Sequence, residues 1–116
     1  MEARAISKYN RQSARKMRLV VDLIRGKHVG EAQAILQFSK KRAAECVDKT
    51  LRSAVANARS KADVAGEYVD VDELFVKEAY VNEGPRLKRW RAAAMGRAAP
   101  IRRPTSHVVI VVDTKE

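Results

Sequence analysis

The segment from Glu83 to His107, EGPRLKRWRAAAMGRAAPIRRPTSH, limits the fold of this 116-residue chain more than any other part of it. It holds all three prolines, and after Glu83 it has no acidic residue. Its seven cations are Arg86, Lys88, Arg89, Arg91, Arg97, Arg102 and Arg103. These charges repel one another, and the few large apolar side chains cannot offset the backbone entropy that is lost when the segment becomes ordered. The segment therefore needs an outside partner to order it.

The stretches on both sides of this basic segment are typical of β-strands. Leu74–Val81 (LFVKEAYV) is rich in β-branched and aromatic residues, and Ser106–Asp113 (SHVVIVVD) is a nearly continuous run of Val and Ile. Two such strands predict a long β-ribbon, an extended hairpin over about residues 82–106 with arms that reach about 30 Å. The alternative is a mobile, solvated loop. The excess of arginine over lysine favours the ribbon, because guanidinium groups grip phosphate oxygens and stack on bases.

Three segments in the first half of the chain have the apolar periodicity of amphipathic helices. Ser13–Lys27 begins with a good N-cap residue and has a basic outer face, whereas His28–Phe38 is shorter and is weakened by Gly30. Ser39–Lys61 is the longest, and its alanine-rich stripe predicts close packing on a flat surface such as a sheet. Ala3–Tyr9 can pair at the sheet edge. The predicted class is α+β: three helices packed on a small antiparallel sheet with a long protruding β-hairpin, in one domain of residues 1–116.

The net charge of +10, from 24 basic and 14 acidic side chains, requires a polyanionic partner. We expect nucleic acid and not a membrane, since no apolar run is long enough to span a bilayer and the N-terminus lacks the apolar core of a signal peptide. The first helix also has no aromatic anchor for a membrane surface. The acids concentrate between Asp63 and Glu83, which predicts a dipolar molecule with one face for the polyanion.

The usual signatures of an enzyme or a metal site are missing from the sequence. Cys46 is the single cysteine, so we expect no disulfide and no cysteine-based zinc site, a reducing compartment, and a small core side chain at this position. His28 and His107 lie far apart with no motif around either, and the acids form no paired-carboxylate site. We expect no catalysis and no cofactor.

The candidate RNA-binding residues are cations of the first 27 positions and of the basic segment, with one aromatic residue and one histidine. They are Arg4, Lys8, Arg11, Arg15, Lys16, Arg18, Arg25, Lys27, Arg86, Lys88, Arg89, Trp90, Arg91, Arg97, Arg102, Arg103 and His107. The cations either bind phosphates or form an ordinary solvated surface. Trp90 is a sheet residue, a wedge between RNA segments or a stacking platform, and its basic neighbours favour stacking. His107 either touches RNA or caps the strand with hydrogen bonds, and the role of Asn57 stays open.

Three blocks of sequence carry a resemblance to a known family. They are YNRQSARKMRLVVDLIRGK (Tyr9–Lys27), KRAAECVDKTLRSAVANA (Lys41–Ala58), and FVKEAYVNEGPRLKR (Phe75–Arg89) followed by GRAAPIRRPTSHVVIVV (Gly96–Val112). In this order and spacing, the chain resembles the large-subunit ribosomal protein twenty-two family in its bacterial form, from about Ala3 to Asp113. Two departures stand out: Ala14 replaces the usual proline, and the hairpin tip has alanines in place of the usual proline and arginine before Gly96 and Arg97.

This resemblance implies a structural constituent of the large ribosomal subunit that binds several domains of its RNA, aids early assembly and meets neighbouring ribosomal proteins. It implies a cytoplasmic location in the ribosome, and we expect no homo-oligomer. The hairpin tip is implied to form part of the exit-tunnel wall and to meet the nascent peptide; its residues are Ala92, Ala93, Ala94, Met95, Gly96 and Arg97. The alternative is a free-standing basic RNA-binding or RNA-chaperone module, which would lack stable association with the ribosome.

Overall fold

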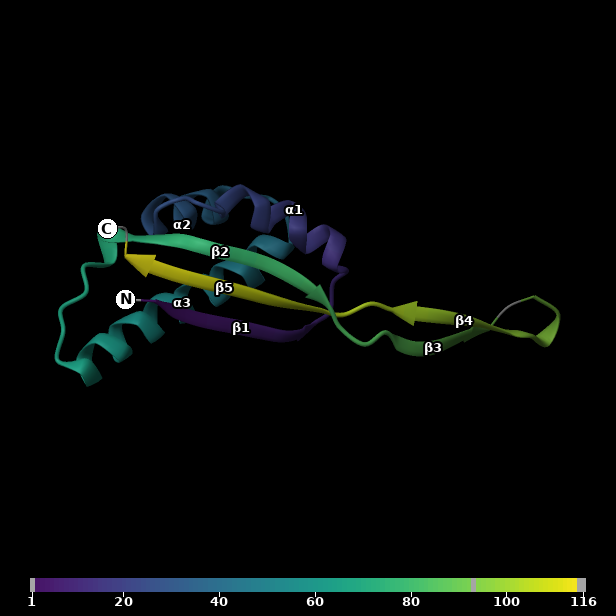
Figure 1. Cartoon of the computed structure of the whole chain (residues 1–116). Helices are drawn as coiled ribbons and strands as arrows, with labels where there is room; N and C mark the ends of the chain where they lie inside the picture. The colour runs from purple at the N-terminus through teal and green to yellow at the C-terminus, as the bar shows by residue number, and fades with distance from the viewer. Residues whose placement is uncertain (1, 93, 115–116) are drawn as a thin grey trace.

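The computed structural model describes residues 2–92 and 94–114. These residues form three α-helices and five β-strands, which confirms the predicted α+β class (Figure 1). The helices are α1 (Ala14–Ile24), α2 (Val29–Phe38) and α3 (Ala43–Ala65). The strands are β1 (Ala3–Asn10), β2 (Leu74–Glu83), β3 (Leu87–Ala92), β4 (Ala98–Arg103) and β5 (Ser106–Thr114). The three predicted helices, the two flanking strands and the strand near the start of the chain are therefore all present.

The last strand, β5, is the centre of a three-stranded antiparallel sheet with the order β1-β5-β2. Residues 108–112 of this strand are all buried, which explains why its sequence is a continuous apolar run. In the two outer strands, β1 and β2, buried and exposed side chains alternate instead. In β1 the inward Ala5 is buried and the neighbouring Arg4 is exposed, and in β2 the same holds for Val76 and Lys77.

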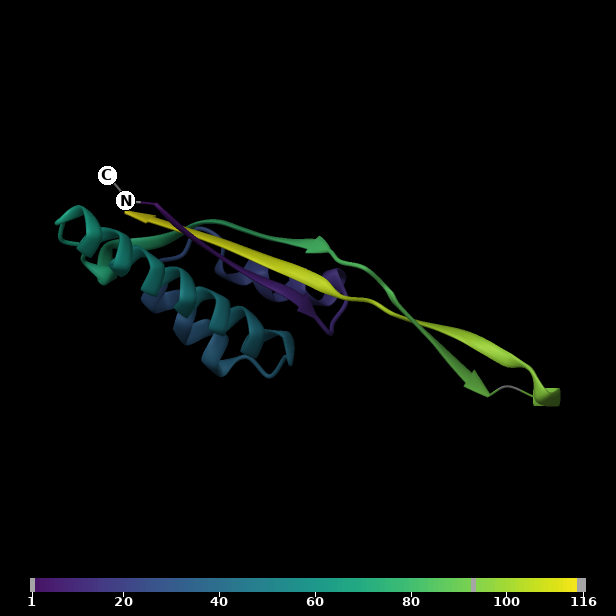
Figure 2. The same cartoon turned by 90° about the horizontal axis from the view of Figure 1, so that it is seen from below.

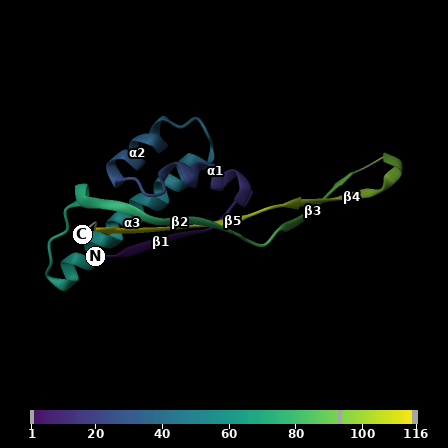
Figure 3. The same ribbon diagram turned by 45° about the horizontal axis from the view of Figure 1, so that its top comes forward.

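The three helices cover one face of this sheet (Figure 2). Helix α3 lies along β1 and β5, and its stripe of Val47, Leu51, Ala54 and Ala58 has no exposed surface. Small side chains on α3 and on the inward face of β1 let the two backbones approach closely, as the alanine-rich stripe predicts. Helix α1 packs on β2, and α2 lies beside α1 and α3 (Figure 3). The core is therefore built between a helical layer and one sheet face.

One core prediction needs correction. Cys46 is only half-buried, at the rim of the core where α3 faces the end of β1. Its thiol donates a hydrogen bond to Asn10 Oδ1 at 3.0 Å, and Ser7 Oγ lies 3.7 Å from the sulfur. Cys46 thus joins a small polar cluster that holds α3 to β1, because the strand end next to it is polar and not apolar.

The basic segment forms a β-ribbon that projects from the body and gives the molecule extents of 66 × 28 × 17 Å (Figure 1). Strands β3 and β4 make a separate two-stranded antiparallel sheet, from the pair Leu87–Arg103 to the pair Ala92–Ala98. No side chain of these two strands is fully buried. The ribbon is a continuation of the chain segments of β2 and β5, so the body holds both of its arms at the base.

The junction between body and ribbon is tightly packed around Gly84. Its N–H donates to the Thr105 carbonyl at 2.9 Å, and the buried Thr105 hydroxyl donates to the Pro85 carbonyl. A Cβ on Gly84 would lie 2.6 Å from Thr105 Oγ1 and 3.1 Å from His107 Nε2. Only glycine lets the two arms approach to this distance.

We predict that Gly84→Ala lowers the free energy of unfolding by about 1–3 kcal/mol, because Thr105 must move and lose its hydrogen bond to Pro85. Gly30→Ala is the matched control. A Cβ on Gly30 meets no atom within 4 Å, so alanine in this helical position should raise the stability by about 0.5–1 kcal/mol. Urea unfolding followed by circular dichroism measures both, and equal stability of the two variants would show that the junction is loosely packed.

Candidate nucleic-acid interface

A groove of about 890 Å³ opens at the end of the body from which the ribbon departs. Four parts of the chain line it: the β1–α1 turn, the first turns of α1, the α2–α3 loop and the ribbon base. They bring together five cations, which are Arg11, Lys16, Lys41, Arg42 and Arg103. No carboxylate lines the groove in the part of the chain that the structure describes. We call this surface the basic groove.

The basic groove includes the N-terminus of α1, which starts after the N-cap residue Ser13. The Ser13 hydroxyl accepts a hydrogen bond from the Lys16 N–H at 3.4 Å, as the sequence predicts. The first turn of the helix has no acid and instead contains Arg15 and Lys16. Cations are unfavourable at the positive end of a helix dipole, whereas an anion bound there is stabilised by the dipole and by the side chains together.

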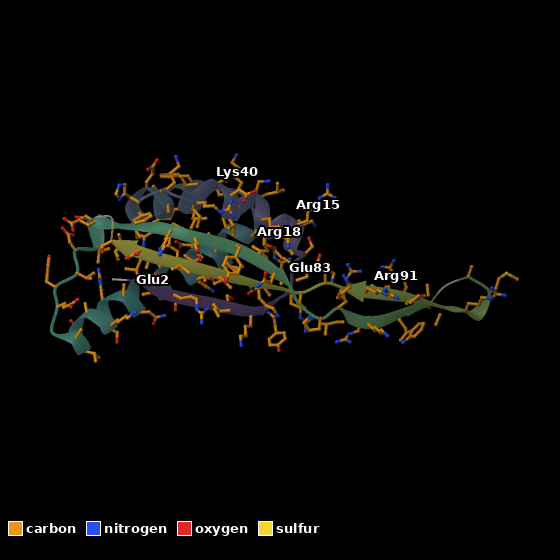
Figure 4. The ribbon with its side chains drawn as sticks, in the orientation of Figure 1. Glu2, Arg15, Arg18, Lys40, Glu83 and Arg91 are labelled. Atoms are coloured by element: carbon orange, nitrogen blue, oxygen red, sulfur yellow. The ribbon has the colours of Figure 1, made fainter. Side chains whose placement is uncertain are left out.

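A second groove, of about 380 Å³, also lies at the ribbon base and shares the lining residues Ser13 and Pro104 with the first. Arg15, Arg86 and Arg102 line it with a single acid, Glu83. Figure 4 shows Arg15 at the end of the body where the ribbon begins. Basic side chains from two adjacent grooves therefore gather at the start of the ribbon.

The cations of the two grooves have no ion-pair partner in the part of the chain that the structure describes. Among the described residues, none of the eight has a carboxylate oxygen within ion-pair distance; they are Arg11, Arg15, Lys16, Lys41, Arg42, Arg86, Arg102 and Arg103. The opposite end of the sheet is different. There Lys77 Nζ donates to Glu2 Oε2 at 3.1 Å and lies 3.7 Å from Asp113, and the Glu2 contact raises the pKa of Lys77 above its ordinary value.

The ribbon has cations on both of its faces. Cross-strand partners share a face, so Lys88 and Arg102 lie directly opposite each other on one side. The other side carries three arginines, each opposite an apolar residue: Arg89 with Ile101, Arg91 with Ala99 and Arg103 with Leu87. Two faces of like charge allow the ribbon to lie between two polyanionic segments.

Two of the predicted RNA-binding arginines bond to the protein's own backbone. Arg18 donates from Nε and Nη2 to the Val81 carbonyl at 3.3 and 2.9 Å, and Arg25 donates in the same way to the Ala79 carbonyl at 3.1 and 2.6 Å. Both carbonyls belong to the edge strand β2, which pairs with β5 on one side only; on its other side the Val76 backbone bonds to Gly26 and Lys27. Arg18 in α1 and Arg25 at the C-cap of α1 therefore cover a part of this edge that would otherwise be free to pair with another chain.

Further predicted residues lie away from the grooves. Lys27, in the α1–α2 loop, is 3.8 Å from Glu31, and Arg4 and Lys8 lie on the sheet face without helices. His107 accepts a hydrogen bond from the Tyr9 N–H on Nδ1 at 3.0 Å, and the two rings meet edge-to-face. The geometry of His107 thus matches the capping alternative.

Asn57, whose role the sequence left open, is also bonded within the protein. Its amide donates to the Arg4 carbonyl at 2.9 Å. The contact ties α3 to the outer edge of β1, so this residue helps to close the second edge of the sheet.

The sequence-based candidates missed Lys41 and Arg42 in the basic groove. Their signal was present as the run Ser39–Arg42 (SKKR), which the periodicity assigned to the start of the long helix. The helix begins instead at Ala43, so the run forms a loop next to the β1–α1 turn. Lys40, from the same loop, is also exposed (Figure 4).

At the ribbon tip, the described residues Ala94–Gly96 form a tight turn whose backbone is not helical at Met95. Met95 and Gly96 both have positive φ, at 62° and 72°, and the Met95 side chain is 97% exposed. No neighbouring atom lies within 4 Å of a Cβ built on Gly96, so its own backbone conformation and not a nearby group favours glycine there. Ala93 lies outside the described residues.

In the described part of the chain, no helix is long and apolar enough to cross a membrane, and no three His, Cys, Asp or Glu side chains form a potential metal site.

The sequence of this chain was compared with those of known protein families and proteins. A model of the family described as ribosomal protein L22p/L17e matches residues 5–113. The chain belongs to this family. The large ribosomal subunit protein uL22 of Halothermothrix orenii is 52% identical over 100% of this chain and 98% of that protein. The uL22 proteins of Bifidobacterium longum and Desulfitobacterium hafniense are 55% and 57% identical, over 100% and 99% of this chain and 98% and 97% of their own lengths.

Membership in the L22p/L17e family confirms the resemblance inferred from the sequence blocks and makes the chain a structural constituent of the large ribosomal subunit. The family is one of structural proteins, and the match spans both the body and the ribbon. The matched residues 5–113 include those that line both grooves in this chain.

We predict that Arg25→Met and Arg15→Met separate stability from binding. Arg25→Met removes the donors that satisfy Ala79 and should lower the free energy of unfolding by about 1 kcal/mol, with RNA affinity nearly unchanged. Arg15→Met removes a groove cation with no internal partner and should weaken RNA binding at unchanged stability. Urea unfolding and RNA titration of both variants measure this, and loss of RNA affinity by Arg25→Met alone would contradict the assignment.

Proposed function

We propose that this structural constituent of the large ribosomal subunit binds ribosomal RNA with the two grooves at the ribbon base and with both faces of the ribbon. The observation that carries the proposal is the convergence of five cations from four parts of the chain in one groove without a carboxylate. Such a group is costly for an isolated protein, whereas phosphates that enter the groove release their counterions and gain several contacts at once.

The body and the ribbon have different tasks in this proposal. The basic groove fixes the position of the body, because three of the four parts that line it belong to the body and only Arg103 and Pro104 come from the ribbon base. The ribbon extends the contact over about 36 Å, which is the reach of the twelve residues from Gly84 to Met95, or eleven steps of about 3.3 Å. One RNA-binding unit thus reaches from the outside of an RNA structure towards its interior.

We place the ribbon tip in the wall of the tunnel through which the nascent peptide leaves, as the resemblance implies. Small side chains at Ala92, Ala94 and Gly96 suit a narrow passage, and Met95 is free to project into it. The alanines at the tip stand where the family resemblance leads us to expect a proline and an arginine, which should alter contacts with the peptide and with drugs that bind there. Early assembly and contact with neighbouring ribosomal proteins belong to the same proposal.

We predict that Lys41→Gln with Arg42→Gln weakens the binding of ribosomal RNA and makes it less dependent on salt. Loss of two phosphate contacts should reduce the slope of log K against log salt by about 1.4–1.8, at about 0.7–0.9 for each phosphate. The matched control is Arg52→Gln with Arg59→Gln, which removes the same charge from α3 outside both grooves. Binding across a salt series measures both slopes, and equal losses in the two double variants would overturn the role of the basic groove.

A shortened ribbon tests the division between body and ribbon. Deleting the two cross-strand pairs Arg91–Ala99 and Ala92–Ala98 draws the tip back by about 7 Å, and keeps the faces of the remaining pairs. We predict that this variant enters the large subunit but changes sensitivity to drugs that bind the tunnel. A variant with Arg11, Lys16, Lys41 and Arg42 all changed to Gln should instead enter poorly.

Co-sedimentation with the large subunit after a high-salt wash measures incorporation, and growth with a tunnel-binding drug measures the second effect. Normal incorporation of the groove variant together with exclusion of the shortened ribbon would show that the ribbon, and not the body, directs assembly. The same wash tests the free-standing alternative, since a chaperone module would be removed by it.

A further inference from the structure

The only tryptophan of the chain, Trp90, lies in the middle of β3 and is 70% exposed. An indole left in water gives up most of the free energy that its burial would supply, and a threonine or valine would suit an exposed ribbon position equally well. Among the described residues, a ring–ring contact is found only between Tyr9 and His107, at the base of the ribbon. The fold of the ribbon therefore does not explain this side chain.

The cross-strand partner of Trp90 is Pro100. Proline has no N–H, so it fits a two-stranded ribbon only where the ladder has no hydrogen bond, and at such pairs the facing side chains lie closest together. A rigid pyrrolidine ring thus stands directly across from the indole. This arrangement limits the positions of the indole while most of its surface stays open to the solvent.

The next pairs on the same face differ in the two directions. Towards the body, two residues away along each strand, Lys88 lies opposite Arg102, an unfavourable pair of like charges. Neither of them has an ion-pair partner in the described part of the chain. Towards the tip, Ala92 lies opposite Ala98, and these short side chains leave space beside the indole. An aromatic surface with two cations on one side and free space on the other matches a single nucleotide, whose base and phosphate are spaced in this way.

We propose that Trp90 is the stacking platform for one unpaired RNA base, and that Lys88 and Arg102 hold the phosphate of that nucleotide or of its neighbour. The inference rests on the RNA-binding function proposed above and names the part of the RNA that this ribbon face takes. A paired base has both of its faces covered in the helix, so the ligand is a bulged or single-stranded nucleotide. The opposite ribbon face, with its three arginines and no aromatic residue, takes backbone phosphates only.

Because the chain has one tryptophan, its own fluorescence reports on this site. The full-length protein is titrated with a short oligoadenylate, with a blunt RNA duplex of the same number of phosphates, and with inorganic polyphosphate. Anisotropy of labelled RNA measures binding, and competition measures it for polyphosphate. Stacking predicts strong quenching of Trp90 by oligoadenylate and little quenching by the other two at equal saturation. Equal quenching by all three would overturn the stacking site, whereas absence of binding by any RNA would instead refute the proposed RNA-binding function.

A pair of variants tests the energetic contribution. Trp90→Leu should lower the affinity for oligoadenylate by about fivefold or more and leave the affinity for the duplex unchanged, and Trp90→Phe should retain most of the affinity. Phe38→Leu, at an aromatic side chain that is 86% exposed on α2, is the matched control and should change neither. Equal losses for oligoadenylate and duplex in Trp90→Leu would mean that the indole only supports the ribbon, and the stacking site would be wrong.

Discussion

The antiparallel pairing of β2 with β5 is the interaction on which the rest of this structure depends. In the body the pair runs from Leu74–Thr114 to Glu83–Ser106, and the two strands then continue through the Gly84–Thr105 junction into the ribbon. The inward side chains of β2 and β5 are buried under the helices, whereas no side chain of the basic strands β3 and β4 is fully buried. The core therefore holds in register a pair of arms that have no core of their own.

Arginine serves two opposite purposes around this pair, and the surroundings decide which. Beside the edge of β2, where backbone carbonyls lack a strand partner, Arg18 and Arg25 are held by hydrogen bonds and protect the fold. Beside the ribbon base, Arg11 and Arg15 form no hydrogen bond or ion pair with their side chains in the described part of the chain, and they keep their donors for a partner. Charge alone does not separate the two groups, because all four residues belong to the same short stretch of basic sequence.

This difference explains how far the sequence predicts the molecule. The stripe of α3, the Val/Ile run of β5 and the charged segment with its prolines are local patterns, and each leads directly to its element. The contacts of Arg18 and Arg25 join residues 63 and 54 positions apart, so they follow from the packing of α1 beside β2 and from no local pattern. Lys41 and Arg42 were missed for the same reason, since only the fold brings their loop to the β1–α1 turn.

The separation of charge along the molecule also has a physical consequence for folding. The acids between Asp63 and Glu73 lie at the end of the body opposite the ribbon (Figure 1). Salt screens charges over about 8–10 Å, whereas the molecule is 66 Å long, so these acids cannot relieve the repulsion between Lys88 and Arg102. They do keep one end of the body unattractive to phosphate, so that a polyanion meets the ribbon end first. The ribbon is thus stabilised by its partner. The core of the body alone sets the direction in which the ribbon projects.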